Sequence, residues 1–467
     1  MSVSDAVAAP PGRPLHEAVM IASLLQMVQR DVTRGVAGTI LLKVGSGGLA
    51  FALFSLAART MSPDAFGTFA MWLSIAQIAS VVGLVGQELL LVRFLNEYRV
   101  DGEDGLTKGV LLFSLKISVM ATLAAAAVVI AIGGVRGDSA WLLVSVAVFV
   151  GVNSGLMLGS QIARAVVGIL MGEGNREFFW RIFVVAGLLA LLLGGGMITP
   201  TQLFALMAAA MFGGLIVQIV AIVRNLPQMR GVPATFERER WRASGFRFWL
   251  SSILEAANQY FDVILIYWML DPVMAGIYFA ASRLANVFAM LSAALYTFAA
   301  RRLPSLYFSK QHDEFRHTLI LMAEVTALCV VSGLFVIWVG APYLLGLFGK
   351  HFVSQQWTLI VLAIGTAIQA AGGPAAAIIQ LTGHERAYVP VVAANVVLRL
   401  IGFFALIPWL GVLGAAISAT VSLTLATVAL NVMCRRWTGV DPSILVLFRR
   451  PNWKTKPAAA PATGPKV

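Results

Sequence analysis

The sequence predicts an all-α membrane protein with about twelve transmembrane helices, arranged as two parallel six-helix repeats, an N-lobe and a C-lobe. Three observations lead to this expectation: an apolar composition over a long chain, an internal repeat, and a one-sided distribution of basic residues. Of 467 residues, 59% are hydrophobic and 12% are charged, and the mean hydropathy is +0.84. A soluble domain carries roughly 25% charged residues, so a chain of this composition is expected to cross a membrane many times.

The stretch from Ser62 to Tyr98 returns later in the chain as Asp271 to Tyr307. Each copy reads as a short turn, a long apolar helix and an Arg-bearing exit. The matched pairs lie 209 positions apart and include Pro63 with Pro272, Gly67 with Gly276, Phe69 with Tyr278, Ala76 with Ala285, Arg93 with Arg302, Gly174 with Gly383, and Ala210 with Ala419. We therefore expect one structural unit written twice.

A spanning helix needs about 20 apolar residues, and six such segments can be drawn in each half. They are 36–60, 66–94, 108–132, 140–169, 179–198 and 202–223, then 247–270, 275–302, 317–340, 355–381, 388–408 and 411–433. Because six is an even number, both halves enter the membrane from the same side. The repeat is therefore parallel, with its axis along the membrane normal.

Basic residues indicate the orientation. Most of the 34 Lys and Arg fall in loops on the side of the N-terminus, whereas the opposite loops keep only Arg59, Arg136 and Lys350. Since cytoplasmic loops carry the excess of Lys and Arg, we expect both termini in the cytoplasm of a bacterial cell. The formal charge of +12 is then typical of a surface facing the anionic leaflet rather than of nucleic-acid binding.

These boundaries divide the chain into five parts. Residues 1–34 form a cytoplasmic N-terminal segment with one apolar face, as in a helix lying on the membrane. The N-lobe covers 35–224, a basic cytoplasmic linker 225–246, and the C-lobe 247–435. The tail 436–467, rich in Pro, Ala and Lys, is expected to be a disordered cytoplasmic segment.

A polar stripe in the seventh segment marks the candidate site. Its members fall at i, i+3, i+4 and i+7 and so share one helix face; they are Glu255, Asn258, Gln259 and Asp262. A polar face turned to lipid is strongly unfavourable, so the stripe should line water or a neighbouring helix.

The eighth segment runs back with Arg283 and Asn286. Asp262 and Arg283 lie about ten residues on either side of the turn, hence at similar depth given a rise of ~1.5 Å per residue. We expect a cavity-facing Asp–Arg pair, and mutual neutralisation of the two charges is the equally weighted alternative. Proton or sodium coupling through Glu255 or Asp262 stays open, because carboxylates in a low dielectric hold protons near neutral pH.

The N-lobe carries a second set of charges. Lys43, Glu88 and Lys116 lie in successive segments at comparable depths, which predicts a charge cluster. Cations in a cavity suit a phosphorylated substrate, since Arg binds phosphate through two hydrogen bonds and Lys as a point charge. Packing or lipid-headgroup contact is the favoured interpretation for the other charges within segments, Arg164, Glu324 and Arg399.

The sequence lacks the patterns of enzymes and metal proteins. Gly45 to Gly48 is not followed by the Gly-Lys-Ser/Thr that a phosphate loop requires, and no His lies inside a segment beyond its first residue, His317. Cys329 and Cys434 are interpreted as small apolar fillers. No loop opposite the cytoplasm is long enough for a catalytic domain. We therefore expect no enzyme, no cofactor and no metal.

Three stretches carry a resemblance to a known family. They are AARTMSPDAFGTFAMWLSIAQIASVVGLVGQELLLVRF, VGAPYLLGLFGKHF and AAAIIQLTGHERAYVPVVAANVVLRLIGFFALIPWLGVLGAAISA. Together they resemble the bacterial polysaccharide (lipid-linked oligosaccharide) flippases of the multidrug/oligosaccharidyl-lipid/polysaccharide exporter superfamily, over about residues 35–435. The resemblance implies a V-shaped pair of lobes around a central cavity. The fourteen-span relatives that flip the peptidoglycan precursor differ, because no further pair of segments follows residue 435.

The resemblance also implies a function. Such proteins move undecaprenyl-pyrophosphate-linked oligosaccharide across the inner membrane by alternating access, for exopolysaccharide, capsule or O-antigen (lipopolysaccharide) assembly. The expected partners are that substrate, membrane lipids, and a polysaccharide polymerase with its chain-length machinery, but no nucleic acid. Lys43 and Arg283 would neutralise the pyrophosphate. The expected cavity residues are Lys43, Glu88, Glu255, Asn258, Gln259, Asp262, Arg283 and Asn286.

Two other functions compete with this expectation. A cation-coupled multidrug exporter of the same superfamily would use carboxylates and aromatic rings for organic cations, which Glu255, Asp262, Tyr260 and Trp268 allow. A polysaccharide polymerase or ligase usually needs a large periplasmic loop with Arg and His, and the sequence shows no such loop.

Overall fold

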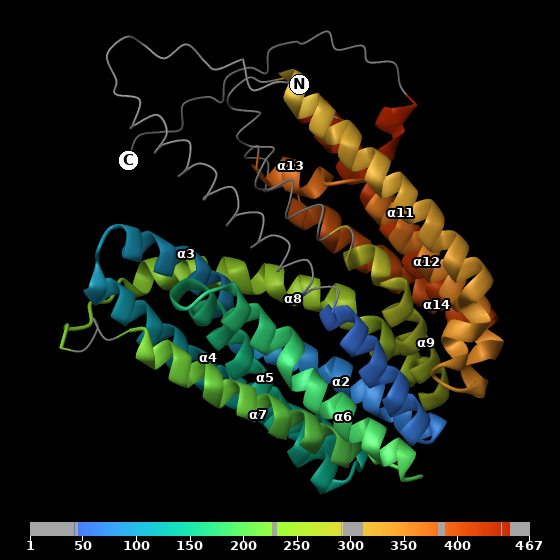
Figure 1. Cartoon of the computed structure of the whole chain (residues 1–467), viewed down its shortest axis with the longest axis horizontal. Coiled ribbons are helices and arrows are strands. Elements are labelled where there is room, and N and C mark those ends of the chain that lie inside the picture. The colour runs from blue at the N-terminus through green and yellow to red at the C-terminus, as the bar shows by residue number, and fades with distance from the viewer. Residues whose placement is uncertain are drawn as a thin grey trace, which may run out of the picture.

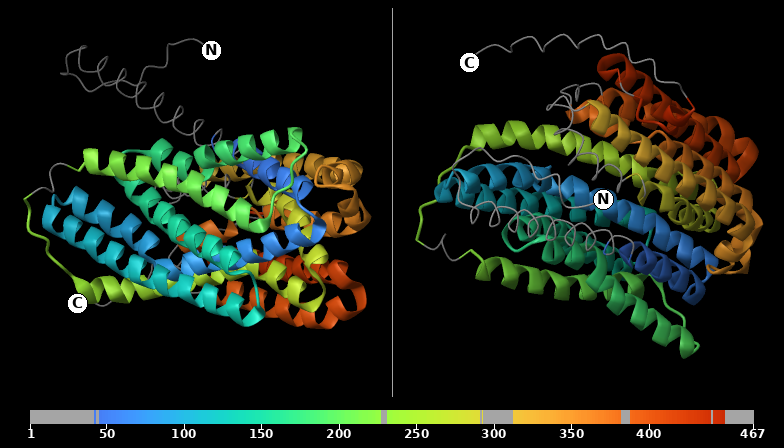
Figure 2. Two further views of the ribbon diagram at one scale, coloured as in Figure 1. Left: turned by 90° about the horizontal axis from the view of Figure 1, so that it is seen from below. Right: turned by 45° about the horizontal axis from the view of Figure 1, so that its top comes forward.

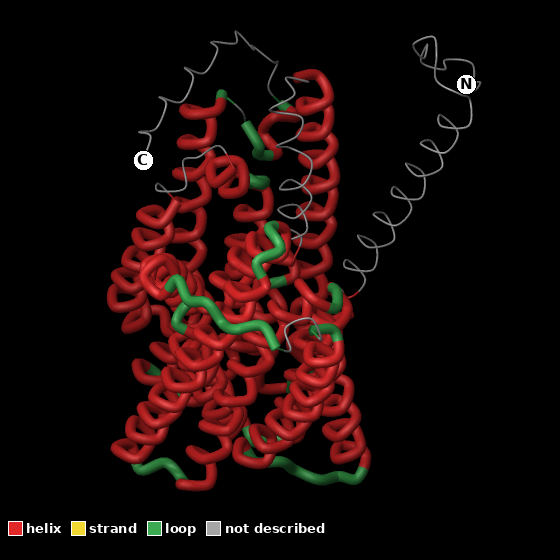
Figure 3. The backbone as a smooth tube through the Cα atoms, turned by 90° about the vertical axis from the view of Figure 1, so that its left-hand side faces the viewer, coloured by secondary structure: helices red, strands yellow, loops and turns green. Residues whose placement is uncertain are grey.

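The computed structural model describes residues 42, 45–226, 231–290, 292, 312–381, 388–439 and 441–448. This part of the chain is almost entirely helical and contains no strand (Figure 3). Its helices form two bundles that converge at one end and diverge at the other (Figure 1). Outside the described residues lie Lys43, the expected N-terminal segment 1–34, the repeat positions Arg302 and Tyr307, Gly383, and the tail from 449.

The first bundle corresponds to the N-lobe. After a helical stretch at 45–60 it contains α2 (Pro63–Leu84), α3 (Gln87–Val100), α4 (Asp104–Arg136), α5 (Ala140–Val166), the π-helix η1 (Leu170–Phe179), α6 (Trp180–Leu193) and α7 (Pro200–Arg224). Helix α5 packs along α7, and α2 packs against α4 and α5. Large buried rings, including Phe69, Phe149 and Phe204, fill the space between them.

The expected single helix at 66–94 is broken in the structure. Val85 and Gly86 both adopt the left-handed conformation, with φ of 52° and 69°, which ends α2 and starts α3 in a new direction. At Gly86 a side chain would have no room, because a Cβ would lie 2.5 Å from the Gly245 carbonyl oxygen and the Trp249 nitrogen. Close packing of α8 against this break therefore requires glycine.

The second bundle corresponds to the C-lobe. It contains α8 (Arg238–Met269), α9 (Pro272–Ala285), α11 (His312–Gly346), the 3-10 helix η3 (Lys350–Gln355), α12 (Gln356–Ala371), α13 (Ala375–Leu381), α14 (Tyr388–Thr438) and the 3-10 helix η5 (Ile444–Leu447). Helix α12 packs against α9, α11 and α14. Helix α8 packs against α9 and also along α2 of the first bundle, so it lies at the junction (Figures 1 and 2).

Helix α14 doubles back on itself. Pro408 is followed by Gly411 with φ 56° and ψ −136°, a conformation that no helix accommodates. Beyond it, Gly414 packs on the Leu406 carbonyl, and the Ser418 hydroxyl donates to the Arg399 carbonyl at 2.9 Å. As the chain moves away from Gly411 in both directions, the residues on one arm contact those on the other, first 414 with 406 and then 418 with 399. The two arms therefore form an antiparallel hairpin, as the separate segments 388–408 and 411–433 predict.

Helices α2 and α9 start in the same way and cross each other. Each has proline in its first turn and an N-cap side chain that accepts a backbone N–H, Ser62 from Ala65 at 3.3 Å and Asp271 from Met274 at 2.8 Å. At the crossing, a Cβ on Gly67 would lie 1.7 Å from the Pro272 carbonyl oxygen. The lobes thus meet at repeat-related positions of the sequence.

The outer surface is suited to lipid. Eight helices within the described residues are long and apolar enough to span a membrane. On α4, large apolar side chains such as Leu115 and Leu123 are more than half exposed, which is unfavourable in water and expected in hydrocarbon. The chain is therefore a multi-pass membrane protein.

The connection between the lobes is fastened to the N-lobe. The Thr235 N–H donates to the Gly105 carbonyl at 3.0 Å. The buried Tyr98 hydroxyl donates to Glu237 at 2.7 Å and accepts the Trp241 indole N–H at 2.9 Å. Burial raises the pKa of Tyr98 to about 12, whereas the hydrogen bond from Tyr98 lowers the pKa of Glu237. The start of α8 is thereby held against α3.

Candidate functional site

The polar stripe of α8 divides between two environments. Glu255 and Gln259 are exposed at the junction of the lobes, whereas Asn258 and Asp262 are half-buried. Asn258 accepts the Asn395 amide N–H at 2.9 Å on its side-chain oxygen. On this helix face, Asn258 therefore packs against α14, whereas Glu255 and Gln259 form a polar surface.

Asp262 pairs with Arg399 rather than with Arg283. The Arg399 Nη1 lies 3.2 Å from Asp262 Oδ2 and donates at 2.8 Å to the Asn258 carbonyl. The Tyr278 hydroxyl donates to the same Asp262 oxygen at 2.8 Å. The two charges neutralise each other inside the C-lobe, so the expectation of an Asp262–Arg283 pair was wrong. Its partner comes from α14, far along the chain, where sequence spacing gave no guide.

Arg283 of α9 lies among aromatic rings instead. Its guanidinium carbon is 4.7 Å from the Phe279 ring centroid, 5.4 Å from that of Tyr260 and 5.7 Å from that of Phe54, a residue of the N-lobe. No ion pair joins it to an acid among the described residues, and its Nε is buried without a hydrogen-bond acceptor. Asn286 follows as the C-cap of α9. Among the described residues this cation is thus held by aromatic rings rather than by an acid.

Glu88 brings the two lobes together. It lies in the first turn of α3, directly after the break, and accepts the Ser252 hydroxyl of α8 at 3.3 Å. Glu255, one turn further along α8, and Arg176 of η1 are both within electrostatic range of Glu88. Lys116, the third member of the expected N-lobe cluster, is exposed on α4 and forms no ion pair with a described residue.

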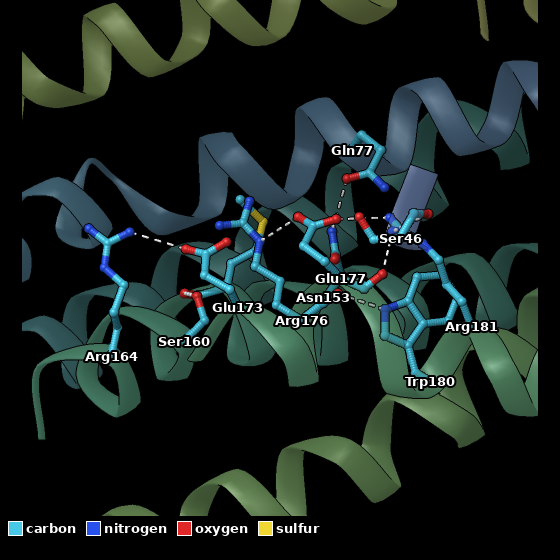
Figure 4. A network of polar contacts seen from close by, with 11 residues as sticks. Ser46, Gln77, Asn153, Ser160, Arg164, Glu173, Arg176, Glu177, Trp180 and Arg181 are labelled. Atoms are coloured by element: carbon cyan, nitrogen blue, oxygen red, sulfur yellow. Dashed lines mark hydrogen bonds and ion pairs between the residues drawn. The ribbon is translucent and has the colours of Figure 1, made fainter. Parts of the chain in front are cut away.

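A charged network runs from the end of α5 along the π-helix η1 to the start of α6 (Figure 4). Of its members, only Arg164 was considered above, as a residue for packing or lipid-headgroup contact. Arg164 contacts Glu173 at 3.1 Å, and Glu177 lies between Arg176 at 3.5 Å and Arg181 at 3.0 Å. Figure 4 also shows Gln77 of α2 next to Asn153 of α5, whose amide donates to it at 3.1 Å. π-Helical segments are rare and frequently occur at functional sites.

This network adjoins Arg283. Arg181 is within electrostatic range of Arg283, across the junction of the lobes. One carboxylate, Glu177, is shared by Arg176 and Arg181, so the guanidinium groups exceed the acids that contact them. The signal was present in the sequence, because residues 173, 176, 177 and 181 share one helix face. It was missed because residues 170–178 were expected to connect the segments 140–169 and 179–198 rather than to be helical.

A second group of contacts closes the convergent end of the lobes. Arg136, at the end of α4, pairs with Asp138 at 2.9 Å and lies 5.0 Å and 4.9 Å from the ring centroids of Tyr267 and Trp268 of α8. Arg59 Nε donates to the Leu347 carbonyl at the end of α11, at 2.6 Å. Arg136 and Arg59, which both belong to the N-lobe, therefore contact the C-lobe at this end.

A family model described as "Polysaccharide biosynthesis protein" matches residues 32–300. The chain belongs to the polysaccharide biosynthesis protein family. It is also similar to the succinoglycan biosynthesis transport protein ExoT of Rhizobium meliloti (strain 1021). The two are 27% identical over 355 residues, which cover 73% of this chain and 67% of ExoT.

Solved structures share the fold of this family member. An inward-facing multidrug resistance MATE family transporter of the MOP superfamily superposes with a TM-score of 0.61 at 14% identity, covering 85% of this chain and 94% of that one. An outward-facing structure of such a transporter gives a TM-score of 0.58 at 15% identity, covering 87% and 94%. MATE in complex with MaL6 gives 0.63 at 14% identity, covering 87% and 95%. The fold is therefore that of the MATE transporters.

Proposed function

We propose that this protein moves lipid-linked oligosaccharide, carried on undecaprenyl pyrophosphate, across the bacterial inner membrane for exopolysaccharide, capsule or O-antigen assembly. The observation that carries the proposal is the set of three guanidinium groups where the lobes meet, Arg176 from η1, Arg181 from the start of α6 and Arg283 from α9. A pyrophosphate offers several anionic oxygens, for which Arg is the best-suited side chain. Membership of a polysaccharide biosynthesis family and similarity to a transport protein support this substrate class.

The scaffold of the proposed transporter is two six-helix repeats. Four further spans join the eight apolar helices: the stretch at 45–60, η1 with α6, α8, and the second arm of the α14 hairpin. Helix α8 falls outside the apolar set because it carries the polar stripe. The like-capped helices α2 and α9, which cross near Gly67 and Gly276, support the parallel repeat and the lobe boundaries at 35–224 and 247–435.

The structure is proposed to be the cytoplasm-open state. By the distribution of Lys and Arg, the loops at Arg59, Arg136 and Lys350 face the periplasm. Arg59 and Arg136 bind across the lobes at that end, where the bundles converge, and the bundles diverge toward the opposite side (Figure 1). These contacts would have to break for the chamber to open outward.

The steps of transport follow from this arrangement. The headgroup enters between the diverging ends while the lipid tail stays in the bilayer, and Arg176, Arg181 and Arg283 neutralise the pyrophosphate. Rocking of the lobes then exposes the sugar to the periplasm. With the inside negative, outward movement of anionic charge is favourable by about 2.3 kcal/mol per charge per 100 mV. Glu88 and Glu255, two acids facing each other across the junction, are the proposed site of proton or sodium coupling.

The proposal is tested by single substitutions in the native host. Arg283→Ala and Arg181→Ala should abolish or strongly reduce polysaccharide export at normal protein levels, because anion contacts are lost. Arg224→Ala, which removes an exposed arginine at the end of α7, is the matched control and should export normally. Export at wild-type level by both Arg283→Ala and Arg181→Ala would refute the pyrophosphate assignment.

A cation-coupled multidrug exporter is the alternative function. It is favoured by the MATE fold and by Glu88 and Glu255, two carboxylates within electrostatic range of each other that could bind an organic cation. Gene deletion separates the two functions. Loss of surface polysaccharide supports the flippase, whereas drug or dye sensitivity with normal polysaccharide supports the exporter.

A further inference from the structure

A groove lies on the lipid-facing side of the junction, formed by the α2–α3 break, α4 and the start of α8. Its volume is about 290 Å³. It is lined by Val85, Gln87, Phe113, Ile117, Arg242, Gly245, Phe246 and Trp249. The lining is apolar apart from Gln87, Arg242 and the indole nitrogen of Trp249, so the polar groups decide what the groove can hold.

Two of these three polar groups are occupied by the protein itself. The Gln87 side chain donates to the Val85 carbonyl at 3.1 Å and accepts the Ser114 hydroxyl at 2.9 Å. The Trp249 indole N–H donates to the Val82 carbonyl at 3.0 Å. Both interior side chains are therefore already hydrogen-bonded within the protein, and a polar molecule would find few partners on entering the groove.

Arg242 is the exception. It is exposed at the edge of the groove and forms no hydrogen bond or ion pair with a described residue. On α4, Lys116 lies next to Ile117 in sequence, is exposed, and likewise has no partner within the described part of the chain. An apolar groove with one unneutralised cation at its edge, Arg242, and a second on the helix that lines it, Lys116, fits an amphiphile with an anionic head.

The side chains around the groove indicate that this amphiphile comes from the membrane rather than from water. The neighbouring side chains Leu112, Leu115, Phe246 and Leu250 are about half exposed or more, so this surface faces hydrocarbon rather than water. Lys and Arg at such a position extend their long side chains toward the headgroup layer. Anionic lipids of the cytoplasmic leaflet carry the complementary charge.

We propose that this groove is a binding site for an anionic phospholipid of the cytoplasmic leaflet. One acyl chain lies over Phe113, Ile117, Phe246 and Trp249, and the phosphate pairs with Arg242 and Lys116. Because α4 belongs to the N-lobe and α8 to the C-lobe, a lipid in this groove contacts both lobes. The site is separate from the transported substrate and does not depend on its identity.

Lipid retention by the purified full-length protein tests the proposal. Native mass spectrometry after incubation with phosphatidylglycerol or phosphatidylcholine should show preferential retention of phosphatidylglycerol. Arg242→Ala and Lys116→Ala should each weaken that retention about fivefold, the effect of one basic side chain near an anionic leaflet. Ile117→Trp, which fills the groove but keeps both cations, should reduce retention of phosphatidylglycerol as well. Arg224→Ala is the matched control and should bind as the wild type.

Three results would overturn the proposal. Equal retention of the two phospholipids would show that charge does not select the lipid. Arg242→Ala behaving like Arg224→Ala would show that the groove is not the site. Displacement of phosphatidylglycerol by equimolar undecaprenyl phosphate would assign the groove to the carrier lipid instead. None of these measurements involves the oligosaccharide, so they are independent of the proposed transport function.

Discussion

At the position that Asp262 occupies in the C-lobe, the repeat places Leu53 in the N-lobe, and Phe69 stands where the C-lobe has Tyr278. Leu53 and Phe69 are fully buried among apolar side chains, whereas Asp262 and Tyr278 form a hydrogen-bonded network with Arg399. The N-lobe places its charges instead on η1, where they are more exposed. The C-lobe thus holds a structural charge pair where the N-lobe is apolar, and the N-lobe carries its more accessible charges on another element.

The buried pair should give the largest effect on stability. Arg399→Met leaves the Asp262 carboxylate buried without its cation, which typically costs about 3–5 kcal/mol. Adding Asp262→Leu makes this site apolar, as it is in the N-lobe, and should recover most of the loss. Thermal unfolding in detergent measures both variants. An unchanged unfolding midpoint for Arg399→Met, or no recovery in the double variant, would show that the pair does not stabilise the C-lobe.

The two repeat-related glycines at the lobe crossing should differ. Gly67→Ala places a Cβ 1.7 Å from the Pro272 carbonyl oxygen, whereas the nearest atom to a Cβ on Gly276 is a Phe66 ring carbon at 3.1 Å. We expect Gly67→Ala to cost at least about 1–3 kcal/mol, the usual range for overpacking, and Gly276→Ala to cost less. Gly48→Ala, with nothing within 4 Å, is the control. Unfolding midpoints in the reverse order would contradict the crossing geometry.

The accessible charges of η1 should contribute little to stability. Glu177→Gln removes a partly exposed carboxylate shared by Arg176 and Arg181, and pairs of this kind contribute about 0.2–1 kcal/mol. The same change increases the net positive charge near Arg283, so binding of inorganic pyrophosphate should tighten. Calorimetric titration of the purified protein measures that affinity. Weaker pyrophosphate binding by Glu177→Gln would exclude η1 from the anion site.

The smallest effect is the pH dependence of the connection between the lobes. The pKa of Glu237 is lower in the folded state than in the unfolded chain. Ionised Glu237 therefore stabilises the fold above the ordinary carboxyl pKa, and this stabilisation is lost as the pH falls through the lower pKa of the folded state. The pKa of Tyr98 is raised from 10.0 to about 12, so its contribution is lost between those two values as the pH rises. Tyr98→Phe should flatten both flanks of the unfolding midpoint plotted against pH. If Tyr98→Phe shows the same pH dependence as the wild type, the hydrogen bond between Tyr98 and Glu237 does not stabilise the protein.

Local features were predictable from the sequence, and long-range pairing was not. Proline and glycine at a constant offset predicted that each copy begins with a turn followed by a helix, because the start of a helix is set by residues close together in sequence. The partner of Asp262 was not predictable, because Arg399 reaches it from a different helix hairpin. The break at Val85 and Gly86 was hidden within an apolar run. The close approach of α8, which requires glycine at position 86, is evident only in the folded chain.

Transport by purified protein in liposomes tests the central claim most directly. Vesicles containing the host's lipid-linked oligosaccharide are prepared with wild-type protein or with the double variant Arg181→Ala, Arg283→Ala, and the fraction of headgroups accessible from outside is followed over time. The account predicts movement with the wild type and none with the folded double variant. Equal rates for the two proteins would contradict the claim that guanidinium groups from both lobes bind the pyrophosphate.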